Sequence, residues 1–315
     1  MLGADQEVLA SAFAWLRKQQ RVVLVTVART YGSSPRPAGS LMALNDRGAW
    51  VGAVSGGCVE SHLVARLRDA WPTQPGLISL GTLPEEAEQL GLPCGGRLDL
   101  LVEAVDSPAA LRALLRCIDA RETLARRVCL TTGEVSLHPV SRTQEFSFDQ
   151  QNLEKVFGPQ WRVLLIGAGQ LSRFVAQMAL ALDYEVVVCE PRIEYARQWD
   201  VAGTRLDNNM PDEAAASARD ARSAVLALTH DPELDDLALS VALPSDAFYV
   251  GALGSVASNA ARHKRLAWLG LDAHAIARLH GPVGLPIGSK TPAEIALAIL
   301  AGVTAVRRGV LLVPA

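Results

Sequence analysis

A glycine-rich turn between two short apolar segments constrains the fold of this chain most. Residues 162–166 read RVLLI, the turn GAGQLS follows from Gly167 to Ser172, and residues 185–189 read EVVVC. A strand, a turn that opens a helix and a second strand form a βαβ unit, and Glu190 stands about twenty residues on, where an acid binds ribose. The sequence therefore predicts a Rossmann-like parallel sheet. Its predicted cofactor-binding residues are Gly167, Gly169, Ser172 and Glu190.

The same unit continues with two more strand-like segments, each followed by polar or glycine-rich residues. Residues 224–228 precede Thr-His230-Asp231, and residues 248–250 precede a GALGS turn. Open α/β sheets bind ligands at the carboxyl ends of their strands, so His230 is a candidate acid/base or ligand-contacting group. The equally weighted alternative is a plain helix cap by Asp231. Further on, Lys290 lies in a glycine-punctuated loop before a helix, which predicts an anion or phosphate loop.

Two cysteines flanked by paired glycines mark the N-terminal third. Gly56 and Gly57 precede Cys58 after a strand-like segment, and Cys94 is followed by two glycines before the strand-like residues 98–103. Paired glycines can turn successive N–H groups toward one point, and a nearby helix N-terminus favours a thiolate. Two such thiols suit a soft metal or sulfur transfer, whereas a zinc site would need more ligands. The alternative is two tight turns, each with a small buried cysteine.

Length and pattern predict an α/β protein in three parts. A chain of 315 residues exceeds the usual size of a single core. We expect a mixed α/β domain over residues 1–105 and the Rossmann-like doubly wound domain over residues 161–315. Between them, residues 106–160 are expected to connect the domains, with a helix over 108–127, a short strand over 128–132 and a polar linker or exposed arm over 138–160.

Charge and composition exclude several classes of protein. The net charge of −3 and the pI near 6.1 give no support to a nucleic-acid surface. No apolar run approaches the roughly twenty residues of a membrane span, and the N-terminus lacks the pattern of a signal peptide. Five cysteines form no disulfide framework, so we expect a cytoplasmic protein. A long apolar helix over residues 295–306 suggests a homodimer.

Several motifs resemble the XdhC/CoxI family, the xanthine dehydrogenase accessory proteins. TVARTYGSSPRPAG, VSGGCVE and GLPCGGRLDLLVE are similar to motifs of its N-terminal domain. The Gly167–Ser172 turn, LTHDPELD, GALGS and GPVGLPIGSKTPAEIALAILAGV resemble its Rossmann-type C-terminal domain. The resemblance leaves out only the region around residues 106–160. The chain departs from the family after GALGS, where Val256–Asn259 replace the usual arginines, so an anion contact there is not carried over.

The resemblance implies a chaperone for the molybdenum cofactor rather than a turnover enzyme, with no catalytic residue. Family members bind the cofactor, in its mononucleotide or cytosine dinucleotide form, work with a cysteine desulfurase that supplies the sulfido ligand, and deliver it to an apo molybdenum hydroxylase of the xanthine dehydrogenase or aldehyde oxidase type. Cys58 and Cys94 would then flank the molybdenum, and the C-terminal domain would hold the pterin phosphate or nucleotide.

Two enzyme classes stay open beside the chaperone. The first is an NAD(P)-dependent oxidoreductase, which would use Glu190 for the ribose and His230 as acid/base. The second is a nucleotidyltransferase acting on the cofactor. It would need a triphosphate-binding loop near the N-terminus, for which Gly32–Arg36 is a poor substitute.

Overall fold

The computed structural model describes residues 3–32, 36–82, 97–140 and 145–310. The chain divides between Pro159 and Gln160 into two compact units. In the described part of the chain, no helix has the length and apolar character needed to cross a membrane.

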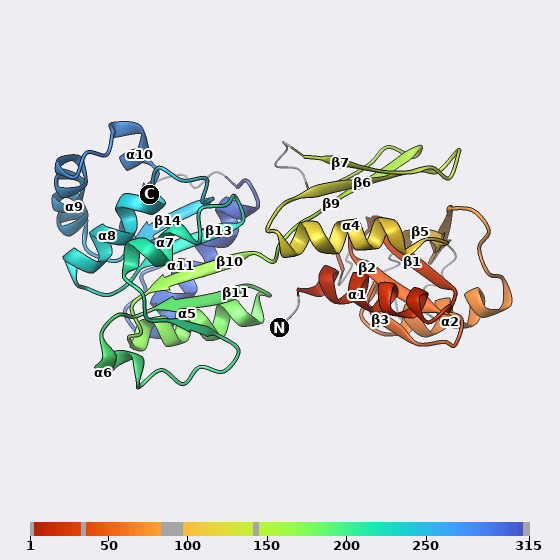
Figure 1. Cartoon of the computed structure of the whole chain (residues 1–315), viewed down its shortest axis with the longest axis horizontal. Coiled ribbons are helices and arrows are strands. Elements are labelled where there is room, and N and C mark those ends of the chain that lie inside the picture. The colour runs from red at the N-terminus through yellow and green to blue at the C-terminus, as the bar shows by residue number, and fades with distance from the viewer. Residues whose placement is uncertain (1–2, 33–35, 83–96, 141–144, 311–315) are drawn as a thin grey trace. The chain divides into compact units, whose positions relative to one another are not determined.

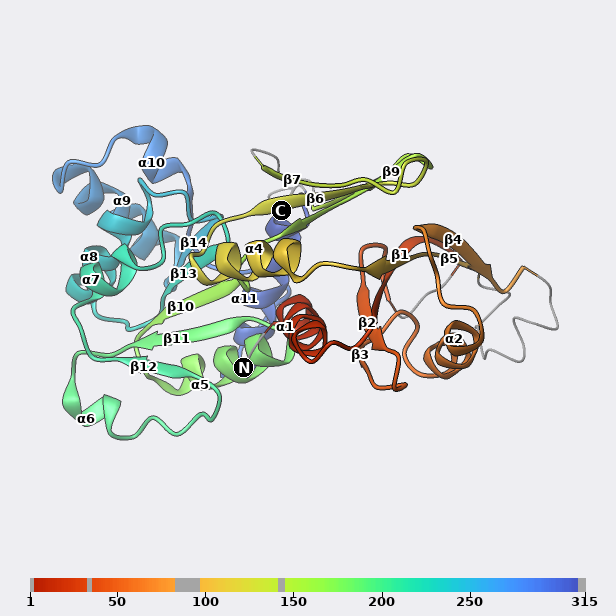
Figure 2. The ribbon, with the colours of Figure 1, turned by 45° about the vertical axis from the view of Figure 1, so that its right-hand side comes forward.

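The N-terminal unit is built on a five-stranded antiparallel sheet with the strand order β3-β2-β1-β5-β4. Its central strand begins VVLVTV and is buried on both faces, because helices cover the sheet on both sides. Helix α2 packs on one face, and helices α1 and α4 pack on the other (Figure 2). The elements are α1 (Ala4–Arg17), β1 (Val22–Tyr31), β2 (Leu41–Asn45), β3 (Trp50–Gly52), α2 (Cys58–Asp69), β4 (Gly76–Leu80), β5 (Arg97–Val105) and α4 (Pro108–Asp119).

A second antiparallel sheet follows where the sequence led us to expect a helix to residue 127, a short strand over residues 128–132 and then a polar arm. The helix ends at Asp119, and the order of the sheet is β7-β6-β9-β8. Buried charges explain the wrong prediction. Arg126 on β6 is 7% exposed and donates two 2.8 Å hydrogen bonds to Glu103 on β5. A paired charge can be buried, so a polar sequence can still form an internal strand. The strands are β6 (Leu124–Cys129), β7 (Val135–Pro139), β8 (Phe146–Phe148) and β9 (Asn152–Phe157).

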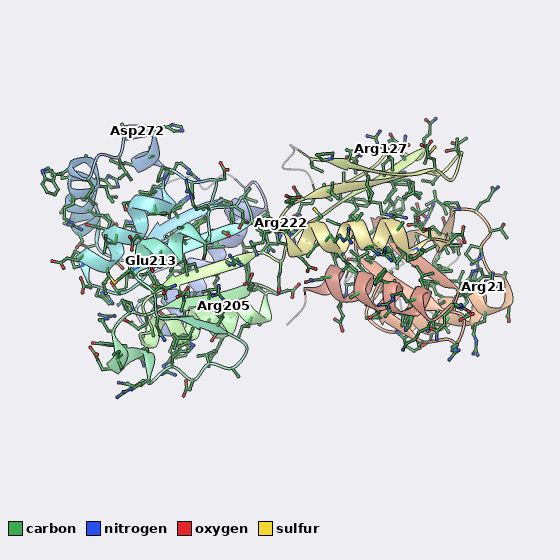
Figure 3. The ribbon with its side chains drawn as sticks, viewed as in Figure 1. Arg21, Arg127, Arg205, Glu213, Arg222 and Asp272 are labelled. Atoms are coloured by element: carbon green, nitrogen blue, oxygen red, sulfur yellow. The ribbon has the colours of Figure 1, made fainter. Side chains whose placement is uncertain are left out.

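The neighbouring side chains of this second sheet also pair. Arg127, labelled in Figure 3, lies next to Arg126 on β6 and donates from Nε to Glu154 on β9 at 2.9 Å. Alternation of side chains sends Arg126 and Arg127 to opposite faces. The sheet thus satisfies its charged residues with carboxylates on both faces.

The C-terminal unit confirms the predicted Rossmann-like fold. Six parallel strands lie in the order β12-β11-β10-β13-β14-β15. Helices α5 and α11 cover one face, while α7, α8 and α9 cover the other (Figure 1). The strands are β10 (Arg162–Ile166), β11 (Glu185–Cys189), β12 (Arg205–Asp207), β13 (Ser223–Ala227), β14 (Tyr249–Ala252) and β15 (Leu279–His280). The helices are α5 (Gln170–Ala181), α6 (Ile193–Ala196), α7 (Pro211–Ala216), α8 (Pro232–Ala242), α9 (Val256–Trp268), α10 (Ala273–Ala277) and α11 (Pro292–Arg307).

Strand β10 lies where the strand order reverses, with β11 on one side and β13 on the other. Because all six strands are parallel, their carboxyl ends meet at one edge of the sheet. The loops that follow β10, β11, β13 and β14 therefore gather at that edge, which is where open α/β sheets bind ligands.

Candidate functional site

The glycine-rich turn after β10 is held tightly against the end of β13. Gly167 has a φ of +103°, and a Cβ at this position would come within 2.9 Å of Thr229 Cγ2. By contrast, a Cβ on Gly169, the N-cap of α5, would meet no atom of the described part of the chain within 4 Å. Gly167 is therefore required by packing, while Gly169 leaves room beside the first turn of the helix. That room and the unpaired N–H groups of a helix start suit an anion.

Glu190, at the tip of β11, is fully buried and bonded within the protein. Its Oε2 accepts from the Ala168 N–H at 2.9 Å, and both oxygens accept from Arg192. Burial alone would raise the pKa of this carboxyl, but the hydrogen bonds from Arg192 and Ala168 lower it below its ordinary value. Glu190 thus supports the glycine turn from the side opposite Thr229. The predicted small residue Ser172 is also fully buried, and its hydroxyl has no hydrogen-bond partner among the residues that the structure describes.

His230 follows β13 in a left-handed backbone conformation, with a φ of +64°. Its neighbour Asp231 is the N-cap of α8 and accepts from the Glu233 N–H at 3.0 Å. Asp231 therefore caps helix α8, which is the alternative that the sequence analysis gave for this residue. The acid/base role of His230 stays a prediction.

A buried charge network joins the ends of β13 and β14. Asp235 accepts from the N–H and hydroxyl of Thr229 at 3.2 and 2.7 Å, and Arg262 on α9 donates to Asp235 at 3.1 Å. Arg262, 5% exposed, also donates to the Leu253 carbonyl at 3.0 Å and to Asn259 at 2.7 Å. Together with Glu190, this network fixes the loops after four strands, so the edge is preorganised for a ligand.

The backbone N–H groups of the loop before α11 are bound by a glutamate of the same helix. Glu294 is at the third position of α11, and its Oε2 accepts from the N–H groups of Lys290 and Thr291 at 2.8 and 2.9 Å. These two hydrogen bonds lower the pKa of Glu294. The backbone donors predicted to hold an anion thus hold a carboxylate of the same chain, while Lys290 itself is exposed.

In the N-terminal unit, the ends of β1, β3 and β4 and the start of β5 lie at the same edge of the five-stranded sheet. Tyr31 at the end of β1 pairs with Arg97 at the start of β5, and Leu80 at the end of β4 pairs with Leu98. Gly52 at the end of β3 lies at this edge as well, because it pairs with the second residue of β2. The segment Val54–Gly57 departs from this edge, and Cys94 precedes β5 by three residues.

The predicted anion nest before Cys58 is filled by Glu60. Glu60 Oε1 accepts from the N–H groups of Val54, Ser55 and Gly56 at 2.8, 2.8 and 3.1 Å. Its Oε2 accepts from the Gly57 N–H at 2.9 Å and from the Ser55 hydroxyl at 2.7 Å. Burial would raise the pKa of Glu60, but the hydrogen bonds from Ser55 and Gly56 outweigh it and lower the pKa to about 2. The backbone N–H groups before Cys58 therefore do form an anion nest, but the anion that they bind is the carboxylate of Glu60 from the same chain.

The two glycines are required by this geometry, since Gly56 and Gly57 have φ values of +109° and +150°. Cys58 begins helix α2, as the sequence predicted for a cysteine near a helix N-terminus. The side chain of Cys58 and all of Cys94 lie outside what the structure describes. Within the described residues there is no group of three or more potential metal ligands. His62, also on α2, is exposed.

Sequence reasoning missed Glu60, Arg192 and the Asp235–Arg262 pair. Glu60 could have been found, because a glutamate three residues after a helix N-cap can accept from the N-cap N–H, as Glu294 also does. At Gly57 only this half of a capping box exists, because glycine has no side chain to complete it. The Asp235–Arg262 pair joins two helices that lie 27 residues apart in the sequence, so no local pattern predicts it. Arg192 follows Glu190 by only two residues, but the spacing alone does not show that its side chain folds back onto the carboxylate.

Comparison with known proteins agrees with the fold and with the sequence motifs. The chain is 26% identical over 317 residues to the molybdenum cofactor insertion chaperone PaoD of Escherichia coli, covering 95% of this chain and 88% of that protein. It is 25% identical over 335 residues to a Bacillus subtilis protein named as a probable xanthine dehydrogenase subunit, covering 95% of this chain and 97% of that protein.

A solved structure from Bacillus halodurans, described as a xanthine dehydrogenase, shares the fold with a TM-score of 0.74. Its sequence is 22% identical, and the match covers 97% of this chain and 96% of that one. The XdhC and CoxI family matches residues 15–81, and the XdhC Rossmann domain matches residues 163–303. With both of its parts matched by the models of one family, the chain belongs to the XdhC and CoxI family.

Proposed function

We propose that this protein is a chaperone that binds the molybdenum cofactor and supplies it to a molybdenum hydroxylase of the xanthine dehydrogenase or aldehyde oxidase type. The observation that carries the proposal is the similarity to a molybdenum cofactor insertion chaperone over 95% of the chain. The cofactor is the cargo of such a protein, so the site must hold it firmly and still release it. The edge of the five-stranded sheet next to Cys58 and the preorganised carboxyl edge of the six-stranded sheet are the parts of the molecule that suit this task.

The thiols of Cys58 and Cys94 are proposed to face the molybdenum end of the cargo. Cys58 is the first residue of α2, where the helix dipole favours a thiolate, and a thiolate is a soft ligand. Because Glu60 already takes the N–H groups of Ser55, Gly56 and Gly57, the backbone before Cys58 offers the cargo no free nest. Gly56 and Gly57 then contribute by shaping the loop.

The carboxyl edge of the six-stranded sheet is proposed to hold the pterin phosphate or nucleotide. Gly169 leaves space at the start of α5, and Lys290 is exposed before α11. Sulfuration of the cargo by a cysteine desulfurase, delivery to the apo-enzyme and a homodimeric state belong to the same proposal. The mononucleotide and the cytosine dinucleotide forms both carry the phosphate that this edge would bind.

The strand order favours one other function, an NAD(P)-dependent oxidoreductase, because it is the order of dinucleotide-binding domains. The state of Glu190 weighs against it. A ribose-binding acid needs free lone pairs, and those of Glu190 accept four hydrogen bonds from Ala168 and Arg192.

The test is to purify the full chain anaerobically from cells that make molybdenum cofactor and to measure bound pterin and molybdenum. Wild type is compared with Cys58→Ala and Cys94→Ala, with Cys129→Ala as the control, a partly exposed cysteine at the end of β6. We expect both cofactor components on wild type and on the control, and depletion of molybdenum from the other two variants. Bound NAD(H) without pterin or molybdenum would refute the chaperone function and support the oxidoreductase. Full loading of both cysteine variants would refute the role of the thiols.

A further inference from the structure

Arg192 stands at the tip of β11, where a dinucleotide-binding domain contacts the ribose. Its Nε donates to Glu190 Oε1 at 2.7 Å, its Nη2 donates to Oε2 at 2.9 Å, and its backbone N–H donates to Oε1 at 3.1 Å. The Ala168 N–H donates to Oε2 at 2.9 Å. A carboxylate offers about four lone-pair sites, so Glu190 has none left for a ribose hydroxyl.

The guanidinium of Arg192 keeps donors for a ligand. Its side chain is 27% exposed, and its side-chain hydrogen bonds to described residues come from Nε and Nη2, none from Nη1. Its Cζ lies 4.2 Å from the ring centroid of Tyr195, so stacking and the two bonds to Glu190 fix the plane of the group. A guanidinium that is already oriented loses little freedom when it binds an oxyanion in bidentate fashion.

The surroundings of Arg192 match a ligand larger than a lone ion. Exposed apolar side chains flank it, with Ile193 at 64% and Tyr195 at 44% exposure. The turn that Glu190 supports through Ala168 leads to Gly169 and the open start of α5. A ligand at this edge would meet a helix N-terminus, an apolar surface for a planar ring and a fixed guanidinium.

We propose that the C-terminal unit binds ligands that present a phosphomonoester to Arg192, and that it does not read a ribose diol at Glu190. Glu190 neutralises Arg192, and Asp231 lies close enough to act on the charge of Arg192. Recognition therefore rests on directed N–H donors rather than on a positive field. The phosphomonoester can be the 2′-phosphate of an NADP-type dinucleotide or the terminal phosphate of a pterin. The pterin source depends on the proposed chaperone function, whereas the nucleotide source does not.

The test uses the full chain and two probes that differ by one group, adenosine 2′,5′-bisphosphate and adenosine 5′-monophosphate, measured by isothermal titration calorimetry. Arg192→Ala and Arg192→Lys are compared with Arg197→Ala, which removes an equal charge from the end of α6. We expect wild type and the Arg197 variant to prefer the bisphosphate about tenfold or more. Arg192→Ala should lose the preference, and Arg192→Lys should keep only part of it. Circular dichroism and the melting temperature verify that each variant is folded.

Equal affinity of wild type for the two probes, no binding of either, or a preference that survives in Arg192→Ala would each overturn the inference. Competition identifies the source. If protein purified with pterin takes up bisphosphate only as pterin leaves, the pterin phosphate occupies this place, and if both bind together, a nucleotide phosphate does. Since bound pterin is assayed without these probes, failure of the phosphate preference and failure of the chaperone function are separate results.

Discussion

Replacing Glu60 with glutamine tests the most unexpected contact in the N-terminal unit. The carboxylate is 3% exposed and accepts five hydrogen bonds from the loop before Cys58. Its pKa of about 2, against an ordinary 4.5, corresponds to roughly 3 kcal/mol of stability at pH 7. Glutamine has one acceptor oxygen, and its amide would oppose the Gly57 N–H or the Ser55 hydroxyl. We expect Glu60→Gln to lower the free energy of unfolding by roughly 2–3 kcal/mol at pH 7.

The pH dependence distinguishes this cause from a simple loss of packing. Because the pKa is depressed in the folded state, the contribution is complete above the unfolded pKa and is lost as the pH falls toward 2. The stability difference between wild type and variant should shrink to roughly 1 kcal/mol at pH 3. Glu294→Gln is the matched control, a glutamate at the same helix position but solvent-exposed, and we expect a much smaller change there.

The assay is hydrogen exchange of the peptide containing Val54–Gly57, with urea unfolding of the full chain beside it. Exchange in this peptide should accelerate in Glu60→Gln at pH 7, because four of its N–H groups lose a charged acceptor. An unchanged exchange rate would show that the nest does not depend on the carboxylate. A stability difference that is equal at pH 7 and pH 3 would refute the depressed pKa.

Three more predictions concern the remaining contacts. Gly167→Ala should destabilise the C-terminal unit by about 1–3 kcal/mol in urea unfolding, owing to its positive φ and the 2.9 Å approach, while Gly169→Ala, with nothing within 4 Å, should leave stability nearly unchanged. Arg262→Leu should lower the free energy of unfolding by about 3–5 kcal/mol because it leaves the buried Asp235 without a cation, while Asp236 keeps Arg265, and a wild-type melting temperature would contradict this. Hydrogen bonds from Thr132 lower the pKa of Cys129, whereas burial raises the pKa of Cys189 to about 12. Cys129 should therefore react with iodoacetamide at pH 8 well before Cys189, and the reverse order would contradict the prediction.

The two cysteine segments show how far local patterns reach. The sequence places a strand, two glycines and a helix start around Cys58, and the structure has these elements. The spacing of Glu60 indicates a hydrogen bond to the Gly57 N–H, but it could not show that the same carboxylate also accepts from Val54, Ser55 and Gly56, because these groups meet only when the loop closes. The sequence also could not show that Tyr31, Gly52 and Arg97 share one edge, since strand pairing across the sheet decides that.

By itself, the sequence determined the Rossmann-like unit, because its cues are local: apolar strands, a glycine turn and a helix of fixed period. Tertiary structure alone decided which charges are buried and which donors are free. From the sequence alone, Arg126 would be expected on the surface, but in the structure it is buried and pairs with Glu103. Glu190 would be expected to accept from a ribose, but in the structure its lone pairs accept from Arg192 and Ala168. The physical reason is that the cost of burying a charge depends on its partner, and the partner is chosen by the fold.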